Sequence, residues 1–362
     1  MTVFNHNNQA WKGGAYPLFL GEAPALYDSI NVTHPKIFKK YKEQKSADWS
    51  EDEVDLEQSR IDMLTCPPEI REIMVENLAL QWEADSIAAR SIAPLFAPFV
   101  TNSEYWAALL KISEIEVLHA LTYSEIVRVC MDKPEEIFKR IMENDEIVGR
   151  MEPVSKAFGT LKLAGAMYTL GQVDSDIAYE VVMEALTALY CLERLQFMAS
   201  FAATFAVVEQ GYFQGIGTLV QKIMQDERYI HAEVGKMALQ IELGTERGQT
   251  WFSSRKDKVK DIIDAVVQVE YNWNKHLHSN GRQVVGFTLS SGIDWIDYNA
   301  QDVYNVFGFE PPRVVEKNPL KFMENWLDLN KTQNANQEGD QANYRLNIIV
   351  DDLGDKIINW SY

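Results

Sequence analysis

The chain has 362 residues, of which 46% are hydrophobic and 24% are charged, and its formal net charge is −19. A chain of this size and composition buries a large core, and its charge excludes nucleic acid and anionic lipid as partners, because both need clustered Lys and Arg side chains. The first residues lack the basic start and apolar stretch of a secretion signal, and no uncharged apolar run is long enough to span a bilayer. We therefore expect a cytoplasmic protein with no membrane partner.

Residues 1–60 contain frequent turn signals, with Pro17, Pro24 and Pro35 interrupting any long helix before the acidic segment around Trp49. This composition predicts an N-terminal arm packed on the body of the protein.

Three isolated cysteines without a CxxC pair predict neither a disulfide framework nor a zinc site.

From Pro67 and Pro68 to the region of residue 330, the apolar residues recur at helical spacing. The pattern predicts helices over 68–90, 103–131 and 133–150. It then predicts a mostly apolar helix over 175–210, ended by Gly211 and buried at the centre, and further helices over 218–243 and 255–278. No stretch alternates as a strand would, so residues 61–330 form an all-α bundle.

The last segment, 331–362, begins with the polar run KTQNANQEGDQAN and closes on a short peptide that contains apolar residues. Such a composition cannot fold alone. It predicts a flexible linker that carries a C-terminal docking peptide.

The stretch EIEVLHALTY places Glu116, His119 and Tyr123 on one face of its helix, because residues three and four apart lie together. One ExxH pair is a weak sign of a metal site. The pattern, however, occurs twice: Asp85 precedes Glu116 and His119 by one helix, and Glu193 in the same way precedes Glu227 and His231.

Four carboxylates and two imidazoles supplied by four helices form the ligand set of carboxylate-bridged bundles that hold two iron or two manganese ions. Oxygen-rich ligation with two nitrogens favours these metals over zinc. Glu193 also lies in an apolar helix, where a lone carboxylate would cost several kcal/mol unless it is paired or bound to metal.

With these motifs in place, the chain resembles the radical-generating small (β) subunit of class I ribonucleotide reductase, over most of its length. The matching segments are WSEDEVD at Trp49, EADSIAAR at Asp85, EVLHALTY from Glu116 to Tyr123, ERLQFMASF from Glu193, QDERYIH ending at His231, and NPLKFMENWL before the tail. The resemblance implies a ferritin-like bundle and a ribonucleoside-diphosphate reductase subunit.

The resemblance implies that Asp85, Glu116 and His119 bind one metal and that Glu193, Glu227 and His231 bind the other, with Glu116 and Glu227 bridging. Two iron ions per chain are implied, and manganese is accepted by the same ligands.

The resemblance also implies that the oxidised metal pair takes an electron and a proton from Tyr123, which then carries a stable radical. Phe197, Phe201 and Ile223 match the apolar shell that shields such a radical.

Trp49 and Asp226 match the family's route for radical transfer to the surface, and Tyr344 resembles the tail tyrosine that passes the radical to the large subunit. The C-terminal peptide would dock on that large (α) subunit. The family also implies a homodimer.

One departure from the family's pattern lies in the second ligand motif, where three residues separate Glu227 from His231 and the family has two. A π-bulge, common at functional sites, absorbs one extra residue in a helix. We therefore predict locally irregular helix over Glu227 to His231, with His231 still facing the metal.

Two other interpretations fit parts of the sequence. A stand-alone di-iron oxidase or ferroxidase uses the same six ligands, but it has no need of Trp49, Tyr123, Tyr344 or the tail. A helical bundle with structural salt bridges and a tail that recruits a partner does not account for the repeated ligand pattern.

Overall fold

The computed structural model describes residues 4–9, 12, 16–22 and 26–329, so the predicted linker, Tyr344 and the docking peptide lie outside the described residues. The helices are α1 Pro35–Ser46, α2 Glu57–Thr65, α3 Pro68–Phe96, α4 Ser103–Cys130, α5 Glu135–Glu143, α6 Asp145–Thr169, α7 Ser175–Cys191, α8 Phe197–Val208, α9 Gln214–Asp226, α10 Ala232–Leu243, α11 Glu246–Leu277, α12 Leu289–Val306 and α13 Phe322–Leu327. A 3₁₀ turn, η2, covers Glu51–Glu53, and two π-helical turns, η3 and η4, cover Leu192–Gln196 and Glu227–His231.

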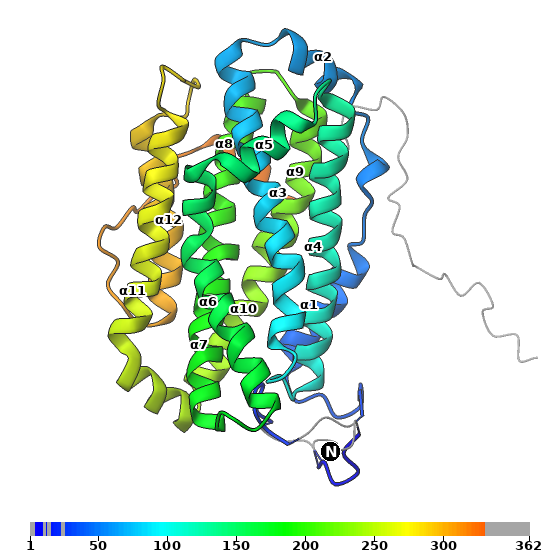
Figure 1. The fold of residues 1–362 in the computed structure, drawn as a ribbon, viewed down its shortest axis with the longest axis vertical. Helices are drawn as coiled ribbons and strands as arrows, with labels where there is room; N and C mark the ends of the chain where they lie inside the picture. Colours follow the sequence, from blue (N-terminus) through cyan, green and yellow to red (C-terminus); the bar gives the residue numbers. More distant parts are fainter. Residues whose placement is uncertain (1–3, 10–11, 13–15, 23–25, 330–362) are drawn as a thin grey trace, which may run out of the picture.

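The long helices run side by side along one axis and form the predicted all-α bundle (Figure 1). Helix α3 packs along α4, α6 packs along α7 and α11, and α12 lies against α11. Among the described residues, β-structure is limited to two isolated bridges, Phe19 with Val100 and Val284 with Phe287.

Most predicted helix starts lie close to the observed ones. Pro68 begins α3, as the sequence predicts, because proline has no N–H to satisfy in the first turn. Helix α4 begins at Ser103, but the residue that caps it is Asn102, whose Oδ1 accepts from Tyr105 N at 2.8 Å.

The structure corrects several expectations about the helices, among them the start of the helix predicted over 255–278, which begins at Glu246 as α11. The helix predicted over 133–150 is two helices, because Asn144 ends α5 and its side chain accepts from Glu146 N to begin α6. Helix α12 was not predicted. The long helix predicted over 175–210 ends at Val208 and contains the π-turn η3.

The segment from Ser175 to Val208 lies at the centre of the bundle, as its apolar sequence predicts. It is the one helix of the described chain that is long and apolar enough to span a membrane, and 94% of its most apolar window is buried inside the protein. Its burial makes it the core against which the other helices pack.

The N-terminal segment lies over the bundle, where α1 contacts α4, α10 and η4. Helix α1 begins at Pro35, and α2 spans the boundary between arm and bundle that we expected at residue 60. The arm thus reaches the helices that carry the predicted metal ligands.

Candidate metal centre

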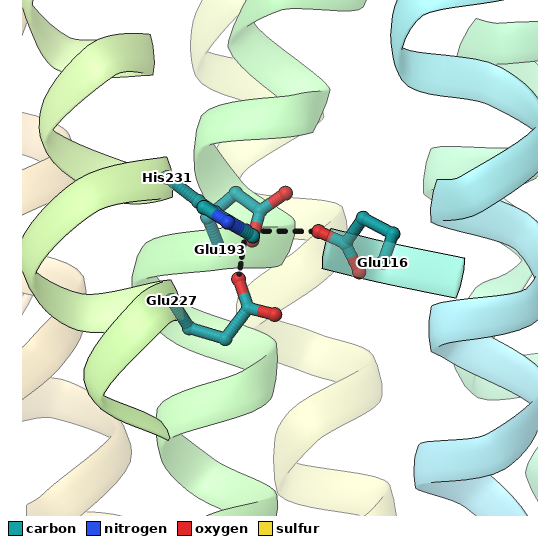
Figure 2. A group of neighbouring side chains, drawn as sticks. All are labelled: Glu116, Glu193, Glu227 and His231. Atoms are coloured by element: carbon teal, nitrogen blue, oxygen red, sulfur yellow. Dashed lines mark hydrogen bonds and ion pairs between the residues drawn. The ribbon is translucent and has the colours of Figure 1, made fainter. Parts of the chain in front are cut away.

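The six predicted ligand residues meet in the middle of the bundle. Two groups have ligand atoms that all lie within 4.8 Å of one another: Asp85, Glu116 and His119 form one, and Glu116, Glu193, Glu227 and His231 form the other. Helix α3 contributes Asp85, α4 contributes Glu116 and His119, η3 contributes Glu193, and η4 contributes Glu227 and His231. Figure 2 shows the second group converging from three directions.

Glu116 and Glu227 each contact both histidines. His231 Nδ1 lies 2.9 Å from Glu116 Oε1 and 2.9 Å from Glu227 Oε2. His119 Nδ1 lies 3.0 Å from Glu227 Oε1 and 3.6 Å from Glu116 Oε2. Each carboxylate therefore presents a different oxygen to each imidazole, which is the arrangement that a bridging ligand between two ions requires.

Two of the buried carboxylates, Asp85 and Glu193, are not satisfied by hydrogen bonds from the described residues. Asp85 and Glu193 are 0% and 1% exposed, and neither oxygen of either side chain accepts a hydrogen bond from the described protein. A buried carboxylate without a donor costs several kcal/mol unless a cation replaces the lost water. The donor set of oxygens and two imidazoles therefore fits two divalent or trivalent metal ions.

Electrostatics in the cluster follow from burial and crowding. Burial raises the pKa of Asp85 well above its usual value, and the neighbouring Glu116 charge adds to the effect. Burial likewise raises the pKa of Glu193 to about 7. Burial also opposes ionisation of Glu116, but its hydrogen bonds with His119 and His231 outweigh that effect and hold its pKa at about 2.

The irregular helix predicted around the second ligand motif is confirmed. Residues Glu227–His231 form a π-turn, and the side chains of both end residues point into the cluster (Figure 2). The extra residue of the motif is taken up within the turn. A second π-turn, Leu192–Gln196, places Glu193, and the sequence carries no spacing signal that would have revealed it.

Tyr123 lies one helical turn beyond His119, fully buried, and its hydroxyl has no hydrogen-bond partner in the described protein. Burial raises the pKa of this phenol well above its usual value, and the negative charge of Asp85 raises it further. The rings of Phe197 and Phe201 stack with centroids 5.9 Å apart, and Ile223 is fully buried.

Asp226 joins the arm to the cluster of carboxylates and histidines. Its Oδ2 accepts from Trp49 Nε1 at 2.8 Å and lies 3.2 Å from His119 Nε2. Its Oδ1 accepts from Gln44 Nε2 at 2.8 Å. The Trp49 ring also stacks on His119, with centroids 6.0 Å apart. Gln44 was not identified from the sequence, because a glutamine in an amphipathic helix carries no distinctive pattern.

Fold and site together define a class of protein: a helical bundle whose core holds a cluster of carboxylates and histidines suited to two metal ions. The family described as ribonucleotide reductase, small chain, matches residues 27–319, and the chain belongs to this family.

Relatives in sequence agree with this assignment. The ribonucleoside-diphosphate reductase subunit beta of Buchnera aphidicola (subsp. Schizaphis graminum) is 27% identical over 94% of each chain. The ribonucleoside-diphosphate reductase 1 subunit beta of Escherichia coli O157:H7 is 25% identical over 91% of each chain.

Solved structures share the fold. The ribonucleotide reductase R2 subunit from Clostridium botulinum superposes with a TM-score of 0.78 at 16% identity, covering 91% of this chain and 98% of that one. The dimanganese(II)-NrdF of Streptococcus sanguinis has a TM-score of 0.68 at 14% identity, covering 84% of this chain and 99% of that one.

Proposed function

We propose that this chain is the small, radical-generating subunit of a ribonucleoside-diphosphate reductase. The observation that carries the proposal is the placement of Tyr123, buried and without a hydrogen-bond partner, one turn from a cluster that joins Asp85 and Glu116 to both histidines. Membership of the small-chain family supports the same conclusion.

In this proposal Asp85, Glu116 and His119 would hold one ion, Glu193, Glu227 and His231 would hold the other, and Glu116 and Glu227 would be shared between the two ions. We propose two iron ions per chain, with manganese as the alternative, since the donor set accepts both. When bound, the metal pair supplies oxygen activation and the oxidising power for a one-electron reaction. Tyr123 would give one electron to the oxidised metal pair and its hydroxyl proton to a base of the cluster, and would then hold the radical.

The chain's own residues keep that radical in place. Phe197, Phe201 and Ile223 are buried apolar side chains that would exclude water and reductants from the region of Tyr123. Trp49 and Asp226 form the hydrogen-bonded route by which the radical would leave, because Asp226 contacts both Trp49 and His119.

Transfer then continues to the large subunit of the reductase. We propose that Tyr344 receives the radical and that the C-terminal peptide of the segment 331–362 docks on the large subunit, both in residues outside the described chain.

We further propose a cytoplasmic homodimer. In support of the dimer, the outer face of α4 exposes Leu110, Val117 and Leu121 at 46%, 47% and 51%, an apolar stripe that a second copy would cover. Sedimentation equilibrium of the purified chain tests the dimer.

The test of the function is low-temperature electron paramagnetic resonance on protein loaded with ferrous iron and then exposed to oxygen, with Tyr123→Phe as the control. We expect a tyrosyl signal in the wild-type protein and none in the variant, while both bind the same amount of iron. Iron oxidation without a tyrosyl signal in the wild-type protein, also after loading with manganese, would contradict the radical assignment.

A further inference from the structure

Two basic side chains reach from neighbouring helices to main-chain carbonyls within π-turns. Lys40 Nζ, on α1, donates to Tyr229 O at 2.8 Å, inside η4. Arg150 Nη2, on α6, donates to Gln196 O at 2.8 Å, at the end of η3. The two turns that receive these cations are the two that carry Glu193, Glu227 and His231.

The position of a π-turn is not fixed by the helix that contains it. An α-helix pairs each N–H with the carbonyl four residues back, and a π-turn uses the fifth instead, so the extra residue can lie at any point along the ladder. When the extra residue moves by one position along the helix, one side chain changes from one side of the π-turn to the other. That side chain is rotated by about 100° around the helix axis, since the α-helix has 3.6 residues per turn. A turn shifted beyond His231 would thus rotate that imidazole out of the cluster.

An external donor selects one position of the turn. The ladder is irregular at a π-turn, so carbonyls there have acceptor capacity to spare, and a charged donor makes a stronger hydrogen bond than a neutral one. The hydrogen bond from Lys40 Nζ to Tyr229 O would favour the turn that has the extra residue between Glu227 and His231 over a shifted one. The ammonium is itself held by Glu43 Oε2 at 2.7 Å, within α1.

The second cation is anchored in the core. Arg150 pairs through Nε and Nη2 with the two oxygens of Glu270, each at 2.5 Å, and both side chains are buried. Gln196 Nε2 donates back to Arg150 O at 3.1 Å and to Glu270 Oε1 at 3.1 Å. The last residue of η3 is therefore bonded to the pair through its main chain and its side chain.

We propose that Lys40 and Arg150 are positioning residues that fix the register of the two π-turns and so keep His231 and Glu193 facing the metal ions. This inference rests on the proposed function only in that the cluster binds two ions. Because Lys40 belongs to the arm, docking of the arm forms part of the metal site.

The test is a titration of metal-free full-length protein with Mn²⁺, in which the free ion is followed by its paramagnetic resonance signal. For Lys40→Met we expect one of the two ions to bind at least about tenfold more weakly, the cost typical of losing a group that orients a ligand. Lys40→Arg keeps a donor and should restore binding. The matched control is Lys39→Met, since Lys39 also pairs with Glu43, at 3.3 Å, but lies on the surface with its side chain 77% exposed.

Deletion of Arg228 separates register control from general docking of the arm. It leaves Glu227 and the histidine three residues apart, a spacing that a regular helix accommodates. In that background Lys40→Met should cause no further loss of Mn²⁺ affinity. An equal loss with and without Arg228, or wild-type binding of both ions by Lys40→Met, would overturn the role of Lys40.

The Arg150 half needs a double variant, because Arg150→Met alone leaves Glu270 as an unpaired buried charge. In Arg150→Met/Glu270→Leu we expect the helical circular dichroism of the wild type and again at least about tenfold weaker binding of one ion. Unchanged binding of both ions by the double variant would refute the positioning role of Arg150. A wild-type protein that binds no Mn²⁺ and no Fe²⁺ would instead contradict the proposed function.

Discussion

Trp49 and His119 share one acceptor, the carboxylate oxygen Oδ2 of Asp226. Asp226 is 5% exposed, and burial raises its pKa. The hydrogen bonds from His119 and Trp49 and the charges of His119 and His231 together outweigh burial, so the pKa of Asp226 lies below its usual value. The ionised carboxylate therefore orients the imidazole of His119 from behind while it also binds the indole. If Trp49 lies on the proposed route, a change at Trp49 would interrupt radical transfer and leave His119 in place.

For Trp49→Phe we expect normal metal binding and a normal Tyr123 signal, because Asp226 keeps its contacts with His119 and Gln44. Reduction of ribonucleotides with the large subunit should fall to background. Electron paramagnetic resonance and a turnover assay on one preparation measure both quantities. Trp82→Phe, at a tryptophan that packs on Phe138, is the control, and equal turnover in the two variants would contradict the route.

The raised carboxyl pKa values predict how the metal-free protein responds to pH. The pKa of Glu193 is about 7 in the fold, against about 4.3 in an unfolded chain. The folded state thus binds the proton more tightly, and the stability it gains at low pH is lost as the pH rises toward 7. Asp85 and Glu227 shift in the same direction.

We therefore expect the metal-free protein to melt several degrees lower at about pH 8 than at about pH 5.5. Metal-loaded protein should lose this dependence, since the ions compensate the carboxylate charges. Scanning calorimetry of the metal-free and metal-loaded protein at the two pH values measures the melting temperatures. A melting temperature of the metal-free protein that rises over this range would show that the carboxylates do not hold protons.

The residues of the site were predictable to the extent that they repeat. Asp85 with Glu116 and His119, and Glu193 with Glu227 and His231, echo each other along the chain, and the structure brings all six together. Gln44, Lys40 and Arg150 were not predicted. Each acts on a residue far away in the sequence, and a single lysine, arginine or glutamine in an amphipathic helix has no local pattern that reveals such a contact.

At the scale of the elements, tight joins between helices fix the geometry. Thr245 caps α11 by accepting from Gly248 N at 2.9 Å. A Cβ on Gly248 would lie 1.8 Å from the main-chain oxygen of Glu242, at the end of α10, so no side chain fits there. The join sets how α11 folds back along the bundle.

Gly248→Ala should therefore destabilise the protein by about 1–3 kcal/mol, the cost of overpacking a tight contact. Gly159→Ala is the matched control, because nothing lies within 4 Å of its Cβ in α6 and alanine favours helix. Urea unfolding of the two variants measures the difference. Equal stabilities would mean that the join relaxes freely.

Helices were predictable where caps and periodicity agree, as at Pro68. The split at Asn144 was missed because one asparagine cap is the only mark of the break. Helix α12 does carry sequence signals that were overlooked: Thr288 and Ser291 form a capping box, and its buried residues recur at three- and four-residue spacing. The π-turn over Glu227–His231 was predictable because this ligand motif has one residue more than the family's pattern, and a π-turn takes up one extra residue. Its counterpart over Leu192–Gln196 has no such motif.

At the scale of the whole molecule, generation of the radical and its use are separate tasks. The metal cluster and Tyr123 lie in the described bundle, and the segment 331–362 follows it in the chain. Removal of 331–362 should leave metal binding and the Tyr123 signal intact and abolish nucleotide reduction with the large subunit. Unchanged turnover of the truncated chain would contradict docking through the tail.

The central helix from Ser175 to Val208 has a consequence for how the protein is made. Its partners α3 and α6 precede it in synthesis, but α9, α11 and α12, which cover its other sides, follow it. Until residue 306 has left the ribosome, a long apolar surface therefore lacks its cover, and such surfaces aggregate. Chains terminated before α12 should be insoluble, and the nascent protein should depend on chaperones more than its acidic, highly charged composition suggests.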